Sequence, residues 1–279
     1  RNRGIELELQ LNSRYQHNRK FTFSHTFSFV SYRNEVTDVK AGYNNTPFAG
    51  FTEVHKAIVK GQPLGVITGN RWQRDADNNI LIGNDGFPLV NNTPGVIGNP
   101  LSDFIVKASN NISYKKHWGF NVDLEWQKGG DRWNGTQALL DYYGRSATTA
   151  AQRNTTGYVF NGVMQNGGHN TIPVSFYDPA LPVEQNRWVR YGHSGVAESY
   201  IEKADCIRLH TMSISYKHYF KKYLQDINFS LYAGNIILWS AYKGADPAQL
   251  LNDEPGAAGL DFFNLPSVKT FGFSVSLQF

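Results

Sequence analysis

The stretch TFGFSVSLQF, residues 270–279, decides the fold class of this chain. Its apolar residues stand at every second position and alternate with small or polar ones: Phe271, Phe273, Val275, Leu277 and Phe279 against Gly272, Ser274, Ser276 and Gln278. A period of two predicts a β-strand with one apolar face and one polar face. Two surroundings suit such a strand: a second protein layer over the apolar face, or lipid on one side and water on the other.

Six further segments show the same alternation, and each predicts a strand of the same kind. They are IELELQLN (5–12), FTFSHTFSF (21–29), DFIVKASNNISY (103–114), FNVDLEWQ (120–127), IRLHTMSISY (207–216) and INFSLYAG (227–234). The alternation is least regular in IRLHTMSISY, which predicts a β-bulge in that strand. The chain is therefore predicted to be all-β, with seven long strands.

The connections between these strands alternate strictly between short and long. The links after the first, third and fifth strands are short turns, whereas the other three run over about 32–102, 128–205 and 240–268. Every long link then leaves from the same end of the sheet. Outer-membrane barrels show this asymmetry, with short periplasmic turns and long extracellular loops. The pattern favours an antiparallel transmembrane β-barrel in the outer membrane, with long loops outside the cell and Phe279 on the periplasmic side.

Seven strands alone leave two open edges, and lipid offers no water to satisfy their backbone N–H and C=O groups. If the complete barrel has an even number of strands, an odd number is missing. We therefore expect residues 1–279 to be one portion of a larger barrel.

The composition narrows the class of protein further. The formal net charge is +4, and the lysines and arginines are scattered rather than gathered in a basic stripe, which argues against nucleic-acid binding. The single cysteine, Cys206, excludes an intrachain disulfide and a cysteine-based zinc site. No run approaches the roughly 18 consecutive apolar residues that predict a spanning helix.

One segment invites a metal-site hypothesis. In DADNNILIGNDG, residues 75–86, the side chains of Asp75, Asp77 and Asn79 have the spacing of a calcium loop. That loop needs Gly at its sixth position and Glu at its twelfth, where this chain has Ile80 and Gly86. The segment is predicted to be a polar hairpin, with a weak calcium site as the alternative. The eight histidines contain no HExxH or HxH spacing, so we expect no metal, no cofactor and no enzymatic activity.

The polar faces of the strands carry charged residues. Neighbouring carboxylates on one strand face lie about 6.6–6.8 Å apart, within the roughly 5–9.5 Å window of glycosidase acid–base pairs. Any alternating, water-facing strand gives this spacing, so a solvated wall is the stronger interpretation. The residues predicted to face the lumen of a barrel are Glu6, Glu8, Lys107, Asn121, Asp123 and Glu125.

The longest predicted loop is rich in aromatic residues, which stack on sugars and also dominate protein interfaces and loop packing. The residues predicted to contact a substrate or a lid protein are Trp133, Tyr142, Tyr143 and Trp188. In another long loop, DPAQLL (246–251) predicts a short helix capped by Asp246 with Pro247 in its first turn.

Several stretches, in this order, resemble the SusC/RagA-like TonB-dependent transporters of the Bacteroidota outer membrane. They are NRGIELELQLN, VIGNPLSDFIVKASNNISYK, GGDRWNGTQALLDYYG, IRLHTMSISY, YAGNIILWSAYKGADPAQL and LPSVKTFGFSVSLQF. Ser240 and Ala241 depart from the family pattern, which usually has Thr-Lys before the tyrosine, and this difference does not threaten the fold.

The resemblance implies a barrel of roughly 22 strands, of which this chain would supply the C-terminal seven, without the plug domain or the earlier strands. It implies import of a bulky glycan or peptide, driven by TonB-ExbB-ExbD through the plug. It also implies a SusD-like surface lipoprotein as a lid over the long loops, and it is compatible with a dimer of such transporter–lipoprotein pairs. Two alternatives stay open: a secreted soluble β-sandwich, either sugar-binding or a glycosidase, and a passive porin.

Overall fold

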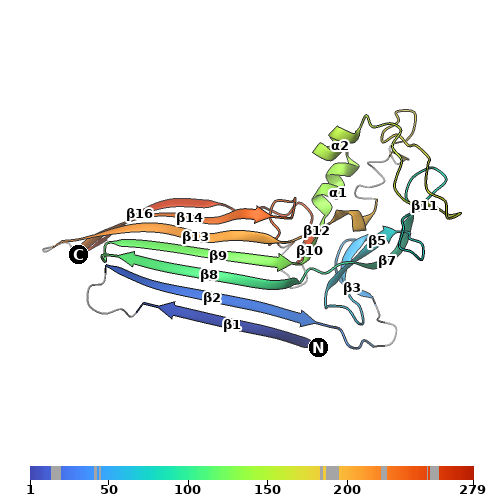
Figure 1. Cartoon of the computed structure of the whole chain (residues 1–279). Helices are drawn as coiled ribbons and strands as arrows, with labels where there is room; N and C mark the ends of the chain where they lie inside the picture. The colour runs from blue at the N-terminus through green and yellow to red at the C-terminus, as the bar shows by residue number, and fades with distance from the viewer. Residues whose placement is uncertain are drawn as a thin grey trace.

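Seven long strands form one curved, open antiparallel sheet, the main sheet, in the order β1-β2-β8-β9-β13-β14-β16 (Figure 1). In this computed structural model the described residues are 1–13, 20–40, 43, 45–182, 185–186, 195–220, 225–249, 251 and 258–279. The strands are β1 (Asn2–Asn12), β2 (Phe21–Asn34), β8 (Ser102–Tyr114), β9 (Trp118–Gly129), β13 (Cys206–Tyr219), β14 (Asp226–Ser240) and β16 (Thr270–Gln278). Each contains one predicted strand, so the predicted antiparallel wall is confirmed.

The predicted irregularity of the fifth strand is also confirmed. The pairing of β13 with β14 shifts register between Ile207 and Arg208, and its pairing with β9 shifts between Leu209 and Thr211. A further shift lies at the start of β8, between Ser102 and Phe104 in its pairing with β9, and along the rest of the main sheet the register is regular. It therefore keeps apolar residues of neighbouring strands on one face of the main sheet and polar residues on the other.

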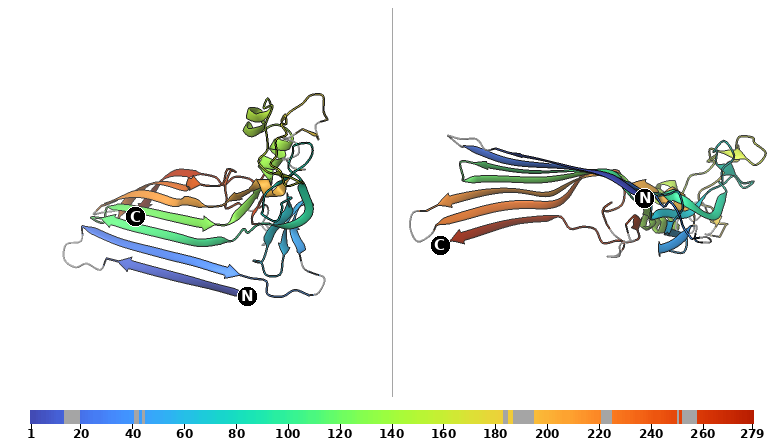
Figure 2. Two further views of the ribbon diagram at one scale, coloured as in Figure 1. Left: turned by 45° about the vertical axis from the view of Figure 1, so that its right-hand side comes forward. Right: turned by 90° about the horizontal axis from the view of Figure 1, so that it is seen from below.

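Within the described residues, no second layer covers the apolar face of the main sheet. Leu7 is 62% exposed, Phe21 is 62% exposed and Phe273 is 61% exposed. Seen from below, the sheet is a single curved layer with the loops gathered at one end (Figure 2, right). A soluble β-sandwich would bury these side chains against a second sheet, so this structure lacks the layer that the soluble alternative requires.

The three long connections, residues 35–101, 130–205 and 241–269, lie together at one end of the main sheet and are called the loop region below. They form a four-stranded sheet, a three-stranded sheet and a two-stranded pair. Their elements are β3 (Thr46–Gly50), β4 (Val54–Ile58), β5 (Val66–Trp72), β6 (Leu81–Ile82), β7 (Val90–Gly98), β10 (Asp131–Asn134), α1 (Gly135–Tyr142), α2 (Ala147–Gln152), β11 (Val163–Met164), the 3-10 turn η2 (Ala197–Tyr200), β12 (Ile201–Lys203) and β15 (Leu260–Asp261). In the part of the chain that is described, none of the helices is long and apolar enough to cross a bilayer.

The principal hydrophobic core lies in the loop region rather than under the main sheet. Side chains from all three long connections form it: Val54, Ile67, Trp133, Ala138, Ala197, Tyr200 and Leu260. The described parts of the long loops therefore pack around a core of their own.

The predicted helix at DPAQLL is wrong over the residues that are described. Residues 246–249 form a turn, in which the Gln249 N–H donates to the Asp246 carbonyl at 3.3 Å. The Asp246 carboxylate accepts from the Ala248 N–H at 2.9 Å, as a cap would. It is also bonded to Arg208 of β13, and this contact holds the segment against the main sheet.

Candidate functional site

The polar face of the main sheet carries a charged cluster at the centre of β8, β9 and β13. Lys107 lies opposite Glu125 in the β8–β9 register, and their Nζ and Oε2 atoms are 3.3 Å apart. On the other side of Glu125, its Oε2 atom lies 3.2 Å from Nε2 of His210 on β13. The Glu125 side chain is only 14% exposed, whereas Lys107 is 60% exposed. The cluster therefore presents Lys107 and His210 to the space in front of this face.

Asp123 is the second carboxylate of this face, and hydroxyl and amide donors surround it. It accepts hydrogen bonds from Ser109 at 2.5 Å, from Asn121 at 3.3 Å and from Thr211. These donors come from β8, β9 and β13, so the carboxylate ties three neighbouring strands together. Hydroxyl and amide donors thus satisfy the oxygens of this carboxylate.

The two glutamates of β1 lie on the same face but apart from this cluster. In the register, Glu8 is opposite Ser28, and Ser28 is opposite Lys107. Both Glu6 and Glu8 are exposed at the outer edge of the main sheet. The structure thus places all six residues predicted to face a lumen on one face, opposite to the apolar side chains.

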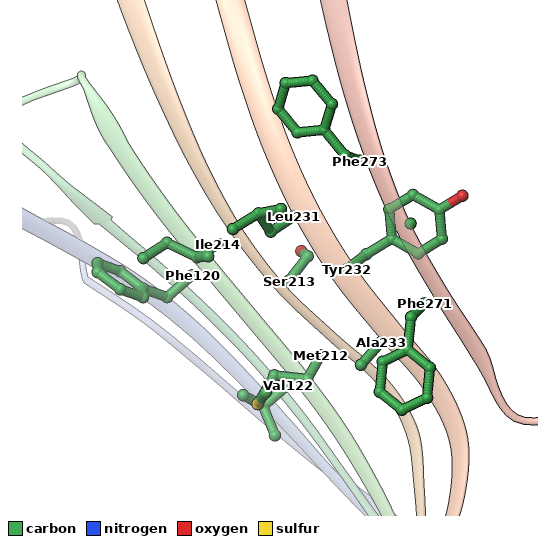
Figure 3. A pocket seen from close by; sticks show the side chains of 11 residues that line it. Phe120, Val122, Met212, Ser213, Ile214, Leu231, Tyr232, Ala233, Phe271 and Phe273 are labelled. Atoms are coloured by element: carbon green, nitrogen blue, oxygen red, sulfur yellow. The ribbon is translucent and has the colours of Figure 1, made fainter.

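The apolar face of the main sheet contains a shallow hollow. On β9, β13, β14 and β16, large rings alternate with smaller side chains around a hollow of about 790 Å³ (Figure 3). Phe273 and Phe271 border it on one strand, and Ala233 leaves space between them and the neighbouring strands. The other apolar side chains at the hollow are Phe120, Val122, Met212, Ile214 and Leu231. A groove of this shape and chemistry fits hydrocarbon chains rather than polar ligands.

The aromatic residues predicted to contact a substrate or a lid protein have different environments. Trp133 is 3% exposed, and its ring lies parallel to Phe262 with an interplanar angle of 6°. Trp133 therefore packs in the core of the loop region, and its predicted contact with a substrate or a lid protein stays a prediction. Tyr143 is 63% exposed and packs edge-on against Tyr142 with ring centroids 5.0 Å apart. Trp188 lies outside the described residues.

Helix α1 positions this tyrosine pair. The Asn134 side chain caps the helix by accepting from the Gln137 N–H at 2.9 Å, which satisfies one of the free donors of the first turn. In the last turn, Asp141 accepts from the buried Tyr200 hydroxyl at 2.8 Å. The helix is therefore fixed at both ends, and Tyr143 at its C-terminal end offers an exposed ring at a defined place.

A buried ion pair joins the loop region to the main sheet. Arg208 and Asp246 make two hydrogen bonds through both guanidinium Nη atoms, and their side chains are 5% and 2% exposed. Burial alone would raise the pKa of Asp246, but the bonds from Arg208, Ser267 and the Ala248 N–H outweigh it and lower that pKa. Sequence reasoning missed this pair, and its only local signal was an arginine at the irregular end of an apolar strand.

Arg132 is a second buried arginine, and its hydrogen bonds join all three long connections. Its guanidinium donates to the Pro247 carbonyl at 2.6 Å, to the Pro100 carbonyl at 3.0 Å and to the Asp131 carbonyl at 3.0 Å. Burial lowers the pKa of this side chain. These bonds connect the long connections to one another, whereas the ion pair of Arg208 connects them to the main sheet.

The suspected calcium segment is a hairpin, as predicted. Residues Arg74 and Ile80 form an antiparallel bridge across it. The Asp75 carboxylate accepts from the backbone N–H groups of Asp77 at 3.0 Å and Asn79 at 2.8 Å, an arrangement typical of an Asx turn. Among the described residues, no group of three or more His, Cys, Asp or Glu side chains could hold a metal ion.

Comparisons with known proteins agree with the architecture. The whole chain is 23% identical, over 310 aligned residues, to TonB-dependent receptor P3 of Formosa agariphila and covers 28% of that protein. It matches the RagAB peptide importer in its open-open state over 100% of this chain and 28% of that one, with a TM-score of 0.63 and 14% identity. For the closed-closed state the match covers 99% of this chain and 29% of that one, with a TM-score of 0.61 and 14% identity. No family model matches the sequence.

The chain thus spans a little over a quarter of the length of each of these proteins. At 14% identity the likeness to the solved structures concerns the fold, and it identifies the open seven-stranded sheet with a segment of a closed barrel. The wall, the loop region and the sequence likeness therefore confirm one prediction: the chain resembles a C-terminal part of a SusC/RagA-like TonB-dependent transporter.

Proposed function

We propose that residues 1–279 form part of an outer-membrane TonB-dependent importer of bulky nutrients, either glycans or peptides. In this proposal the main sheet is barrel wall, its apolar face touches lipid, and its polar face lines the lumen. The loop region is extracellular, and the C-terminal end of β16 is periplasmic. The observation that carries the proposal is the uncovered apolar face, backed by a polar face, in a sheet that matches the RagAB barrel.

The remaining partners follow from this assignment. Further strands of the same barrel would satisfy the open edges at β1 and β16, since unpaired backbone groups are costly in lipid. A plug would fill the lumen and connect it to TonB-ExbB-ExbD, and a SusD-like lipoprotein would cover the loop region. A dimer of such pairs is compatible with this arrangement. The likeness to the RagAB peptide importer supports these assignments.

Lipid contact can be tested at two adjacent residues of β9. Val122 lies on the apolar face and Asn121 on the polar face. Val122→Arg is expected to reduce the free energy of unfolding by about 2–4 kcal/mol if the site is near the bilayer midplane, because a cation then faces hydrocarbon. Asn121→Arg serves as the control and should change it far less. The measurement is urea unfolding of the complete barrel in lipid bilayers, and equal effects of both variants would contradict the assigned faces.

The import function can be tested in the native bacterium, with an affinity tag inserted in the exposed 75–79 hairpin. We expect the tagged chain in the outer-membrane fraction, soluble only with detergent, together with a plug-bearing polypeptide and a surface lipoprotein. Nutrient uptake should stop when TonB is deleted. Release of the chain in buffer would support the soluble sandwich instead, and TonB-independent ion conductance in a planar bilayer would support the porin.

A further inference from the structure

A cavity of about 550 Å³ lies in the loop region and has no role in the wall or the junction. Its sides come from the turn between β3 and β4, from Trp133 of β10 and from Phe262, which follows β15. The turn is fixed by a hydrogen bond of 2.8 Å from the Phe51 N–H to the Val54 carbonyl. Three segments that are distant in sequence therefore converge on one open cavity, as is usual for ligand sites.

Aromatic rings form one wall of this cavity. The ring centroid of Phe51 is 4.8 Å from that of Phe262 and 5.6 Å from that of Trp133. Phe51 and Phe262 are only partly buried, so they line the cavity without being sealed inside the core. Such rings attract apolar groups and the alkyl chains and charges of cationic side chains.

Glu53 places a negative charge at the same cavity. Its side chain is exposed, and among the described residues no lysine, arginine or histidine forms an ion pair with it. Gly50 supports this placement: its φ of 125° and the 2.7 Å approach of an added Cβ to the His55 Cα exclude other residues. The turn thus holds an uncompensated carboxylate beside an aromatic wall.

Trp133 adds an unsatisfied donor. Its indole Nε1 is buried and has no hydrogen-bond partner among the described residues. A buried N–H without an acceptor costs about 1–3 kcal/mol, so its persistence calls for an acceptor that the described chain does not supply. Since Trp133 also lines the cavity, a ligand carbonyl is a natural acceptor once the side chain adjusts on binding.

We propose that this cavity binds a peptide through a basic side chain, with Glu53 pairing the cation, Phe51 and Phe262 flanking its alkyl stem, and a peptide carbonyl accepting from Trp133. A neutral sugar could accept from the indole and donate hydroxyl groups to Glu53, but it brings no positive charge to that carboxylate, which is why the geometry favours a peptide with a basic side chain. The proposal rests on the proposed import function in taking the peptide to be the transported nutrient.

The test measures binding without transport. The detergent-purified transporter complex is titrated calorimetrically with acetyl-Ala-Lys-Ala-amide and with the same peptide carrying norleucine, which has a neutral side chain of nearly the same length. We expect the lysine peptide to bind about tenfold more tightly, the combined effect of an ion pair and contacts with the rings. Glu53→Gln should remove this preference. Asp77→Asn, which removes an exposed carboxylate from a different hairpin, should leave it intact.

The outcomes of this titration distinguish failure of the proposed peptide site from failure of the proposed import function. Equal affinity for the two peptides, or an undiminished lysine preference in Glu53→Gln, would overturn the proposed site. Displacement of the lysine peptide by maltotriose would also overturn it, in favour of a sugar site. Because the titration requires no TonB, a preserved lysine preference in a protein whose uptake proves independent of TonB would refute the import function and leave the site standing.

Discussion

Asp246→Ala is expected to reduce the free energy of unfolding by about 3–5 kcal/mol, because it leaves the Arg208 guanidinium buried without its partner. The two side chains are 5% and 2% exposed, so water cannot replace the lost carboxylate without opening the junction. The Ser267 hydroxyl, which also donates to Asp246, loses its acceptor as well. The measurement is urea unfolding of the folded protein in detergent micelles at neutral pH, well above the lowered pKa of Asp246.

Two variants identify the cause of this effect. Asp38→Ala removes an ion pair with Lys60, in which the Nζ and Oδ1 atoms are 3.0 Å apart, but that carboxylate is 81% exposed, so no measurable change is expected. The double variant Arg208→Met/Asp246→Leu removes both charges and should recover most of the lost stability, because an apolar pair of similar volume needs no compensation. If the double variant is as unstable as Asp246→Ala, the loss comes from packing or from the turn, and the ion-pair explanation is wrong.

Trp133→Ala is expected to reduce the free energy of unfolding of the loop region by about 3–5 kcal/mol, the usual cost of deleting a large buried ring. Trp133 belongs to the core cluster and contacts rings from two other long connections. Its loss would leave a cavity among the three segments that meet around this ring. Limited proteolysis of the folded protein should then cut the loop region much faster, while the main sheet stays protected.

The control for this prediction is Tyr143→Ala. Tyr143 was predicted to have the same role as Trp133, but it is 63% exposed, so its removal should have little effect beyond the contact with Tyr142. Equal protease sensitivity of the two variants would show that the loop region does not depend on the core around Trp133. Faster cleavage within the main sheet in Trp133→Ala would show that wall and loops unfold together.

The wall could be predicted because its pattern is local. A strand in a barrel wall meets apolar surroundings on one face and polar surroundings on the other, and side chains alternate between the faces. Phe273, Ser274 and Val275 therefore already indicate which face each occupies. The bulge in β13 was predictable for the same reason, since an inserted residue interrupts the alternation.

The loops were less predictable, for physical reasons. The DPAQLL segment has helix-capping residues, yet the Asp246 carboxylate that would cap the helix is held by Arg208, 38 positions away in the sequence. Trp133 was singled out from aromatic content alone, and its burial could not be predicted because it depends on Phe51 and Phe262 from other connections. Short strands such as β10 and β15 contain too few residues to show an alternation.

The sequence by itself determined that this chain forms seven antiparallel strands with one apolar and one polar face and with all long loops at one end. The apolar–polar alternation repeats at every second residue, so the strands and their faces can be predicted without knowledge of any distant contact. Only the tertiary structure decided which loop residues are buried, that Arg208 and Asp246 fasten the loops to the wall, and that Glu53 shares a cavity with Trp133. Those features depend on contacts between segments that are distant in the sequence and meet only in the folded protein. They could not be predicted because the loop residues show no periodic pattern.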